Sequence, residues 1–295
     1  MRNAFIDELV ELAECDERIV LMVGDLGFGV VEPFSKRFPD RFINAGVAEQ
    51  NMMGMAAGMA SEGMHVFVYS IANFPTYRCA EQIRNDVAYH ELAVTVVSVG
   101  GGLAYGNLGY SHHAVQDYGL IRSMPNMLIA APGDPMEVRA CVRYLVGAPQ
   151  PSYLRLAKAG ETCLHKKVPN LVPGRWLRIK RGQVGGRTFL TTGATLELAT
   201  QAATEADAVH SLPLWGMGYK SIQADQVLPF ANVATVEDHL LDGGMGSWLM
   251  ESLVGRPDLL VRIRINALDP SVCGMVGRQS TLNREGGLSL EKLCA

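Results

Sequence analysis

The stretch FINAGVAEQNMMGMAAGMASEGMHVFVYSI, residues 42–71, contains a helical segment that leads directly into a strand. Ala48 to Glu62 is rich in Ala, Met and Gly and has the pattern of a buried helix. HVFVYSI, residues 65–71, is a continuous apolar run, which is typical of a strand buried on both faces. A helix followed by such a strand is the repeating unit of α/β proteins, so the stretch predicts a mainly parallel sheet flanked by helices.

The same alternation extends along the first half of the chain. Helices are predicted from Pro75 to about His90, after His113, and from Asp134, where Pro135 and a first-turn acid follow an N-cap residue. The other predicted strands are RIVLMVGD (18–25), LAVTVVSVGG (92–101), MLIAAP (127–132) and PSYLRLA (151–157). The first half therefore predicts one α/β domain.

A second domain is expected because 295 residues exceed the usual size of one compact core. KAGETCLHKKVPNLVPGRWLRIKR, residues 158–181, is basic, punctuated by proline and without helical period, as expected of a linker. Further helix and strand patterns follow it: TFLTTG (188–193), ATLELATQAATEA (194–206), ANVATVED (231–238), a helix from about Gly246, and LLVRIRI (259–265). We predict a first domain over residues 1–157, a linker over 158–174 and a smaller α/β domain over 175–295.

Composition excludes several classes of function. With 26 basic and 30 acidic residues and a pI near 6.0, the chain has no electrostatic signature for nucleic acid or an anionic membrane. No apolar run reaches the roughly 20 residues of a membrane span, and the N-terminal segment carries acids where a signal peptide is apolar, so a cytoplasmic protein is expected. The six cysteines form no CxxC pair, so neither a zinc site nor a disulfide framework is predicted.

Glu49 is the one acid near the start of the otherwise apolar helical segment. Burying a carboxylate is costly unless it is paired or hydrogen-bonded. Two interpretations are open: a first-turn acid favoured by the helix dipole, or a buried acid that shares its proton with a ring nitrogen of a ligand.

Four segments, in this order, resemble one enzyme family. They are INAGVAEQNMMGMAAGMASEG (43–63), FPTYRCAEQIRND (74–86), GNLGYSHHAVQDYGLIRSMPNMLIAAPGDP (106–135) and VEDHLLDGGMGSWLME (236–251). They are similar to segments of thiamine diphosphate enzymes, and in particular of transketolase in its split bacterial form. In that form the C-terminal half, a pyrimidine-binding domain plus a C-terminal domain, is a separate chain. The resemblance covers almost the whole sequence.

The resemblance implies roles for residues of the cofactor site. Glu49 would hydrogen-bond the N1′ atom of the cofactor's pyrimidine and thereby activate the cofactor. Phe74 would stack on the pyrimidine, Tyr77 would line its pocket, and Asp25 would approach the thiazolium side. From spacing alone, aromatic residues three apart are more often part of a core.

The resemblance also implies substrate contacts. His112 would face the substrate and donate hydrogen bonds to its oxygens, which makes it the second catalytic residue after Glu49. Arg155 and Arg2 lie where the family contacts a terminal phosphate, although either could be a solvated surface charge. Leu108 and Gly29 replace an aspartate and a serine of the family, which suggests a modified or branched sugar phosphate as substrate.

One half of the expected site is missing from the sequence. The family binds diphosphate through Mg²⁺ held by a GDG…N motif, whereas this chain has only GDLG. The resemblance therefore implies an N-terminal partner subunit that holds Mg²⁺ and the diphosphate, in an α2β2 assembly with this chain as β. The implied reaction transfers a two-carbon ketol unit from a ketose (phosphate) to an aldose (phosphate).

Two alternatives stay open at this point. The first is the β-subunit of a 2-oxoacid dehydrogenase, which has the same pair of domains, although SMPNM and the linker favour transketolase. The second is a non-catalytic scaffold subunit, against which the retained Glu49, Phe74 and His112 argue. A standalone 1-deoxyxylulose-5-phosphate synthase is disfavoured because its diphosphate domain lies in the same chain.

Overall fold

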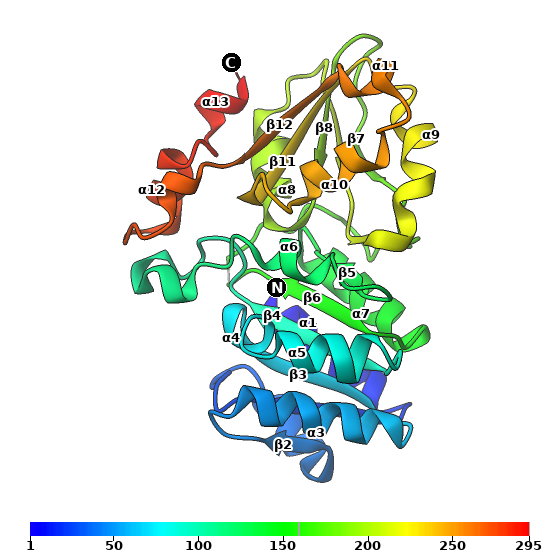
Figure 1. Cartoon of the computed structure of the whole chain (residues 1–295), viewed down its shortest axis with the longest axis vertical. Coiled ribbons are helices and arrows are strands. Elements are labelled where there is room, and N and C mark those ends of the chain that lie inside the picture. The colour runs from blue at the N-terminus through cyan, green and yellow to red at the C-terminus, as the bar shows by residue number, and fades with distance from the viewer. Residues whose placement is uncertain (159, 295) are drawn as a thin grey trace.

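The computed structural model describes residues 1–158 and 160–294 and contains two sheets, one above the other along the long axis of the molecule (Figure 1). The larger sheet has seven strands in the order β10-β5-β6-β4-β3-β1-β2. Its strands are β1 (Ile19–Val23), β2 (Phe42–Asn44), β3 (His65–Ile71), β4 (Val94–Val99), β5 (Leu128–Ala130), β6 (Ser152–Leu156) and β10 (Leu214–Trp215). All neighbours except β10 and β5 pair in parallel, so the predicted α/β fold is confirmed.

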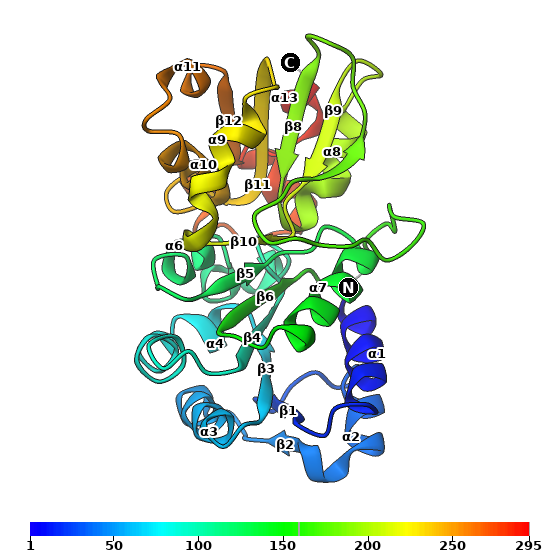
Figure 2. The ribbon, with the colours of Figure 1, turned by 90° about the vertical axis from the view of Figure 1, so that its right-hand side faces the viewer.

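Helices cover both faces of the larger sheet (Figure 2). One face carries α1 (Arg2–Ala13), α2 (Glu32–Arg37) and α7 (Pro135–Gly147), and the other carries α3 (Glu49–Ser61), α4 (Asn73–Thr76), α5 (Ala80–Gln82) and α6 (Asp117–Ile121). Strands β1, β4, β5 and β6 are buried at every position because apolar side chains meet a helical layer on each side.

The single helix predicted from Pro75 to about His90 is wrong in detail. Tyr77 ends α4, a short α5 follows, and residues Ile83–Ala88 form a π-helix. An i→i+5 turn adds a residue to the helical repeat and is often found at functional sites. The apolar pattern predicts the helical segment correctly, but it carries no signal for a change of hydrogen-bond register.

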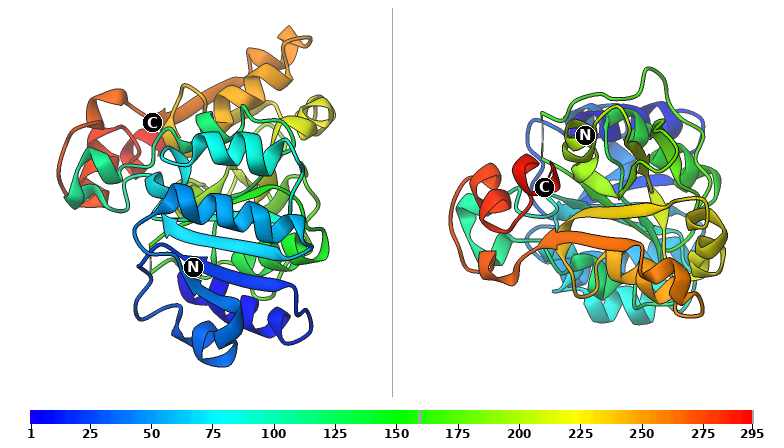
Figure 3. Two further views of the ribbon diagram at one scale, coloured as in Figure 1. Left: turned by 60° about the horizontal axis from the view of Figure 1, so that its bottom comes forward. Right: turned by 90° about the horizontal axis from the view of Figure 1, so that it is seen from above.

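The smaller sheet has the order β12-β11-β8-β9-β7, and only β7 is antiparallel to its neighbour. Its strands are β7 (Leu177–Lys180), β8 (Arg187–Thr191), β9 (Ala208–Ser211), β11 (Asn232–Leu240) and β12 (Ile263–Leu268). Its helices are α8 (Leu196–Ala202), α9 (Gln223–Val227), α10 (Met245–Ser252), α11 (Pro257–Leu260), α12 (Gln279–Glu285) and α13 (Leu290–Cys294). The red-orange α12 contacts residues 106–108 of the first half and lies beside that segment in both views of Figure 3.

Strand β10 departs from the predicted division of the chain. It comes from the second half yet pairs antiparallel with β5, where Leu214 opposes Ala130. The buried Trp215 ring lies 5.3 Å from that of Trp248 on α10 and 5.1 Å from that of Tyr118 on α6. The two halves therefore share one apolar junction.

Within residues 1–158 and 160–294, no helix is long and apolar enough to cross a bilayer.

Candidate active site

The predicted site residues gather at one edge of the larger sheet. Asp25 follows β1, Glu49 follows β2, Phe74 follows β3 and His112 follows β4. Parallel strands present their carboxyl ends at the same edge, and open α/β sheets bind ligands there. The topology therefore brings together residues that are far apart in the sequence.

Glu49 begins α3 and is 2% exposed, so the acid is buried as the sequence suggests. It is not alone, because its Oε2 accepts a hydrogen bond from Nη1 of Arg78 at 2.5 Å. The Arg78 side chain is itself 46% exposed. The buried carboxylate is thus paired with the positive charge of Arg78, which lies at the edge of the site. The surroundings of Glu49 are therefore not purely apolar.

Arg78 also connects Glu49 with the predicted aromatic contact. Its guanidinium carbon lies 4.9 Å from the centroid of the Phe74 ring, within the range of a cation–π contact. The His112 ring meets the same Phe74 ring edge-on at 5.2 Å. Glu49, Phe74 and His112 therefore belong to one cluster.

A pocket of about 560 Å³ opens beside this cluster. Tyr77, 43% exposed, lies on its wall. The lining residues come from the start of the α4 segment and from the loop after β4: Asn73, Phe74, Tyr77, Arg78, Tyr110, Ser111, His113 and Gln116.

Asn73 fixes the loop that carries His112. Its Nδ2 donates to the carbonyl oxygens of Ser111 at 3.2 Å and His113 at 2.6 Å. His113 is buried, and desolvation lowers the pKa of its imidazole, whereas His112 remains partly exposed. Of the two neighbouring histidines, His112 is thus the more exposed, whereas the pocket is lined by His113 and not by His112.

Asp25 stands at the same edge in a left-handed conformation, with φ of 54°. Two hydrogen bonds, both of 3.0 Å, join it to Asn44. The backbone N of Asp25 donates to Oδ1 of Asn44, and Nδ2 of Asn44 donates to Oδ1 of Asp25. A Cβ built at the preceding Gly24 would lie 3.7 Å from Cγ of Glu49. Asp25 is thus an exposed residue held beside the buried acid.

The structure corrects the prediction for Arg155. This side chain is 3% exposed and donates to Asp117 Oδ2 (2.7 Å) and Asp238 Oδ1 (2.6 Å). Its remaining donors go to the Tyr118 hydroxyl (3.3 Å) and to the carbonyls of Ala114 (2.8 Å) and Asp238 (3.2 Å). All five N–H groups are occupied, so Arg155 joins the two halves of the chain and has no donor left for a phosphate.

Arg2 lies instead at an open pocket of about 380 Å³ that includes Gly29 and Lys158. Its Nε donates to the carbonyl of Lys158 at 2.5 Å. Lys158 is a cationic residue that the sequence interpretation missed. The position of Lys158 in the sequence could have indicated its exposure. Lys158 lies two residues beyond the end of β6, at the carboxyl edge of the sheet, whereas Arg155 lies within the buried strand.

Tyr105 links this basic pocket to the Glu49 cluster. The Lys158 Nζ lies 4.9 Å from the Tyr105 ring centroid, and the Tyr105 ring lies 6.3 Å from that of His112. His112 therefore stands between a cationic end, with Arg2 and Lys158, and an acidic, aromatic end, with Glu49 and Phe74.

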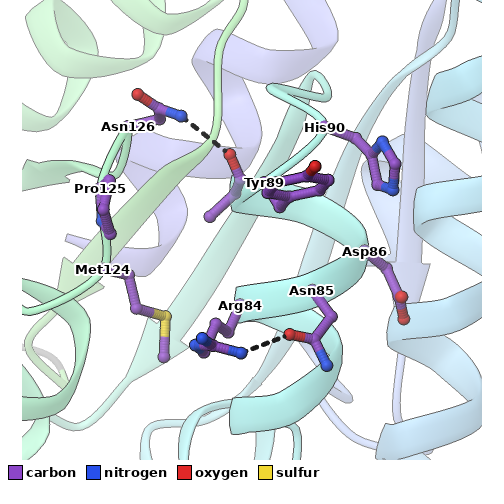
Figure 4. Close-up of a pocket in the computed structure, with 9 residues that line it drawn as sticks. Arg84, Asn85, Asp86, Tyr89, His90, Met124, Pro125 and Asn126 are labelled. Carbon is purple, nitrogen blue, oxygen red and sulfur yellow. Dashed lines mark hydrogen bonds between the residues drawn. The ribbon is translucent and has the colours of Figure 1, made fainter.

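Another pocket, of about 570 Å³, contains none of the predicted site residues (Figure 4). It lies between the π-helical segment and residues 124–126. Asn126 adopts a left-handed conformation, with φ of 67°, and its Nδ2 donates to the carbonyl of Ala88 at 3.1 Å. Arg122 begins the sequence RSMPN, residues 122–126, and pairs with Glu251 on α10 at 2.7 Å. Residues 122–126 therefore connect structural elements in this chain.

The cluster fits half of the expected cofactor. A buried acid, linked through Arg78 to the partly exposed Phe74 ring, suits a flat heterocycle with a ring nitrogen. Within the part of the chain that the structure describes, no group of three or more His, Cys, Asp or Glu side chains could hold a metal ion. The described residues therefore fit the heterocycle of the cofactor, but not its metal-bound diphosphate.

Comparisons with known proteins find relatives that match almost the whole chain. Residues 1–160 match the family described as the pyrimidine-binding domain of transketolase. An apulose-4-phosphate transketolase subunit from Phocaeicola vulgatus is 31% identical over 99% of this chain and 95% of its own length. A putative transketolase C-terminal section from Methanocaldococcus jannaschii is 32% identical over 99% of this chain and 93% of its own.

A solved structure is similar over the same extent. It is described as a split-gene transketolase, inactive beta4 tetramer, and superposes with a TM-score of 0.85 at 28% identity over 99% of this chain and 95% of that chain.

Proposed function

The chain belongs to the transketolase family, and on that premise we propose that it is the C-terminal subunit of a split transketolase that uses thiamine diphosphate. The proposed reaction transfers a two-carbon ketol unit from a ketose to an aldose. The observation that carries this proposal is the buried Glu49, which Arg78 links to the Phe74 ring at the carboxyl edge of the sheet.

Each residue of the cluster has a defined task in this reaction. The bound cofactor supplies the nucleophilic carbon and stores the electron pair when the sugar C–C bond breaks. Glu49 would hydrogen-bond the pyrimidine nitrogen and share a proton with it, and Phe74 would hold the ring plane. Arg78 donates a hydrogen bond to Oε2 of Glu49. The bound cofactor would therefore either share this carboxylate with Arg78 or displace the Arg78 side chain from it. Tyr77 and Asp25 would border the bound cofactor.

His112 would act on the substrate. Its place between Phe74 and Tyr105 suits a donor to substrate oxygens on which negative charge develops. Arg2 and Lys158, at the far end of this row, would bind a terminal anionic group of the sugar. The phosphorylated sugar in the name of the Phocaeicola relative supports a phosphate there.

The diphosphate and its Mg²⁺ are assigned to a partner subunit. Support comes from the missing GDG…N motif and from the solved relative that consists of β chains and is called inactive. We propose an α2β2 assembly in which residues 1–157 meet the partner's diphosphate domain and residues 175–295 form the C-terminal domain. The cytoplasm is the proposed location.

The test is a titration of the purified chain with thiamine diphosphate and Mg²⁺, alone and with a candidate N-terminal subunit. We expect tight binding and ketol transfer only in the mixture. Tight binding by the chain alone would contradict the split site. Cofactor binding without transfer from any sugar would favour the scaffold role, and lipoyl-dependent 2-oxoacid oxidation would favour the dehydrogenase β-subunit.

A further inference from the structure

The loop that carries His112, residues 100–116, rests on the C-terminal domain. It leaves the carboxyl end of β4 and includes the two 3₁₀-turns Gly106–Leu108 and Tyr110–His112. In Figures 1 and 3 it projects from the larger sheet and lies beside α12. Its contacts with the C-terminal domain include two backbone hydrogen bonds.

The first contact is a close approach between Gly106 and the α12 segment. The backbone N of Gly277 donates to the carbonyl of Gly106 at 3.1 Å. A Cβ built on Gly106 would lie 2.5 Å from Cδ1 of Leu282, whose side chain is 3% exposed. Leu282 therefore packs directly against the loop backbone, where only glycine leaves enough room.

The second contact holds the far end of the loop. The backbone N of Leu240, at the end of β11, donates to the carbonyl of Val115 at 2.9 Å. Arg155, which is fixed by Asp238, donates to the carbonyl of Ala114 at 2.8 Å. Ala114 in turn pairs with Gly102 across the base of the loop. The C-terminal domain thus holds the loop on both sides of His112.

Without these contacts the loop would be costly to order. Gly100, Gly102 and Gly109 all have positive φ, and such residues lose much conformational entropy when they are fixed. On the side of the first domain, Asn73 supplies two hydrogen bonds near His112. Packing from the C-terminal domain supplies the apolar support that the glycines lack.

We propose that the C-terminal domain positions His112 for the substrate and that Leu282 is the principal positioning residue. The catalytic part of this inference rests on the proposed function, whereas the support of the loop does not. On this proposal the C-terminal domain, in which the sequence predicts no site residue, supports the loop that carries His112.

The test compares Leu282→Ala with Leu293→Ala in the complex with the N-terminal subunit. Both leucines belong to the same apolar cluster and are 3% and 2% exposed, but Leu293 lies on α13, which packs against α8. We expect both variants to lose stability. Only Leu282→Ala should raise amide hydrogen exchange of residues 104–113, by at least about tenfold, because local opening sets that rate.

Catalysis gives the second readout. Displacing a positioned group by about 1 Å can cost on the order of 100-fold in rate, so Leu282→Ala should lower kcat by about 10- to 100-fold. It should leave cofactor affinity unchanged, and Leu293→Ala should retain kcat within about threefold. Equal exchange of the loop in the two variants would overturn the proposal. Faster exchange with normal kcat would overturn its catalytic part, and a wild-type complex without ketol transfer would instead refute the proposed function.

A double-mutant cycle distinguishes loss of the contact between Leu282 and the loop from general misfolding of the variant. Gly106→Ala should also loosen the loop, because the added methyl group meets Leu282 and the carbonyl oxygen of Gly277. Combined with Leu282→Ala, the two effects on loop exchange should be less than additive, since they break the same contact. Full additivity would contradict direct packing of Leu282 on the loop.

Discussion

Arg155 and Lys158 lie three residues apart, yet they belong to opposite kinds of environment. Arg155 lies within β6, an interior strand, and its five donors all meet protein acceptors. Lys158 follows the end of the strand and lines an open pocket with Arg2. The comparison shows that position relative to the strand end, rather than charge, decides whether a cation is available to a ligand.

The buried side of this comparison is a polar network at the junction of the two halves. The Tyr153 hydroxyl donates to Asp117 Oδ2 at 2.6 Å, and the Arg155 guanidinium lies 4.4 Å from the Tyr118 ring centroid. Burial raises the pKa of the Asp238 carboxyl, although Arg155 opposes this shift. Removing one member of such a network leaves an uncompensated buried charge.

The largest expected effect concerns this network. Arg155→Met should lower the free energy of unfolding by about 3–5 kcal/mol, because two aspartates would lose their buried partner. The matched control is Arg18→Met, since Arg18 pairs with Asp16 at 2.7 Å, the same distance as Arg155 to Asp117, but is 60% exposed. The control should lower the free energy of unfolding far less, because solvent screens an exposed ion pair.

Chemical denaturation of both variants measures the difference. Equal losses would show that the junction adds no stability beyond that of a surface ion pair. A large loss of unfolding free energy in Arg155→Met, with an unchanged KM for the folded fraction, would support the conclusion that Arg155 does not contact the substrate.

A smaller effect is expected at the open end of the comparison. Lys158→Met should raise KM for a phosphorylated sugar by about 10- to 100-fold, which corresponds to one lost hydrogen bond to a charged group of about 1.5–3 kcal/mol. The protein should remain as stable as the wild type. Steady-state kinetics of the assembled enzyme test this, with the exposed linker variant Lys166→Met as control. An unchanged KM for Lys158→Met would place the anion elsewhere.

Much of the fold follows from local sequence patterns. Strands β1, β3, β4, β5 and β6 coincide with apolar runs because burial on both faces requires continuous apolar side chains, whereas the short and only half-buried β2 was not predicted. Asp134 caps α7 as predicted, since its side chain accepts a hydrogen bond from the backbone N of Glu137. Strand β10 has two residues and pairs with a partner far along the chain, so no local pattern indicates it.

The site was predictable where it depends on one residue and its neighbours. Burial of Glu49 follows from the apolar helix around it, whereas the sequence did not indicate that His113, rather than the partly exposed His112, lines the pocket. The Arg78 partner of Glu49 lies 29 positions away, and the burial of Arg155 depends on Asp238, 83 positions away. Such pairings arise from topology, which the spacing of residues along the chain does not encode.

The most direct measurement of the central claim compares Glu49→Gln with Glu8→Gln in the complex with the N-terminal subunit. Both acids are buried, 2% and 1% exposed, and each accepts a hydrogen bond from an arginine at 2.5 Å, but Glu8 pairs with Arg143 of α7 on the face of the sheet opposite α3. We predict that Glu49→Gln lowers cofactor-dependent turnover by about 10²- to 10⁴-fold, the usual contribution of a positioned acid–base group, while Glu8→Gln retains turnover in its folded fraction. Equal turnover of the two variants would contradict the assignment of Glu49 to the cofactor.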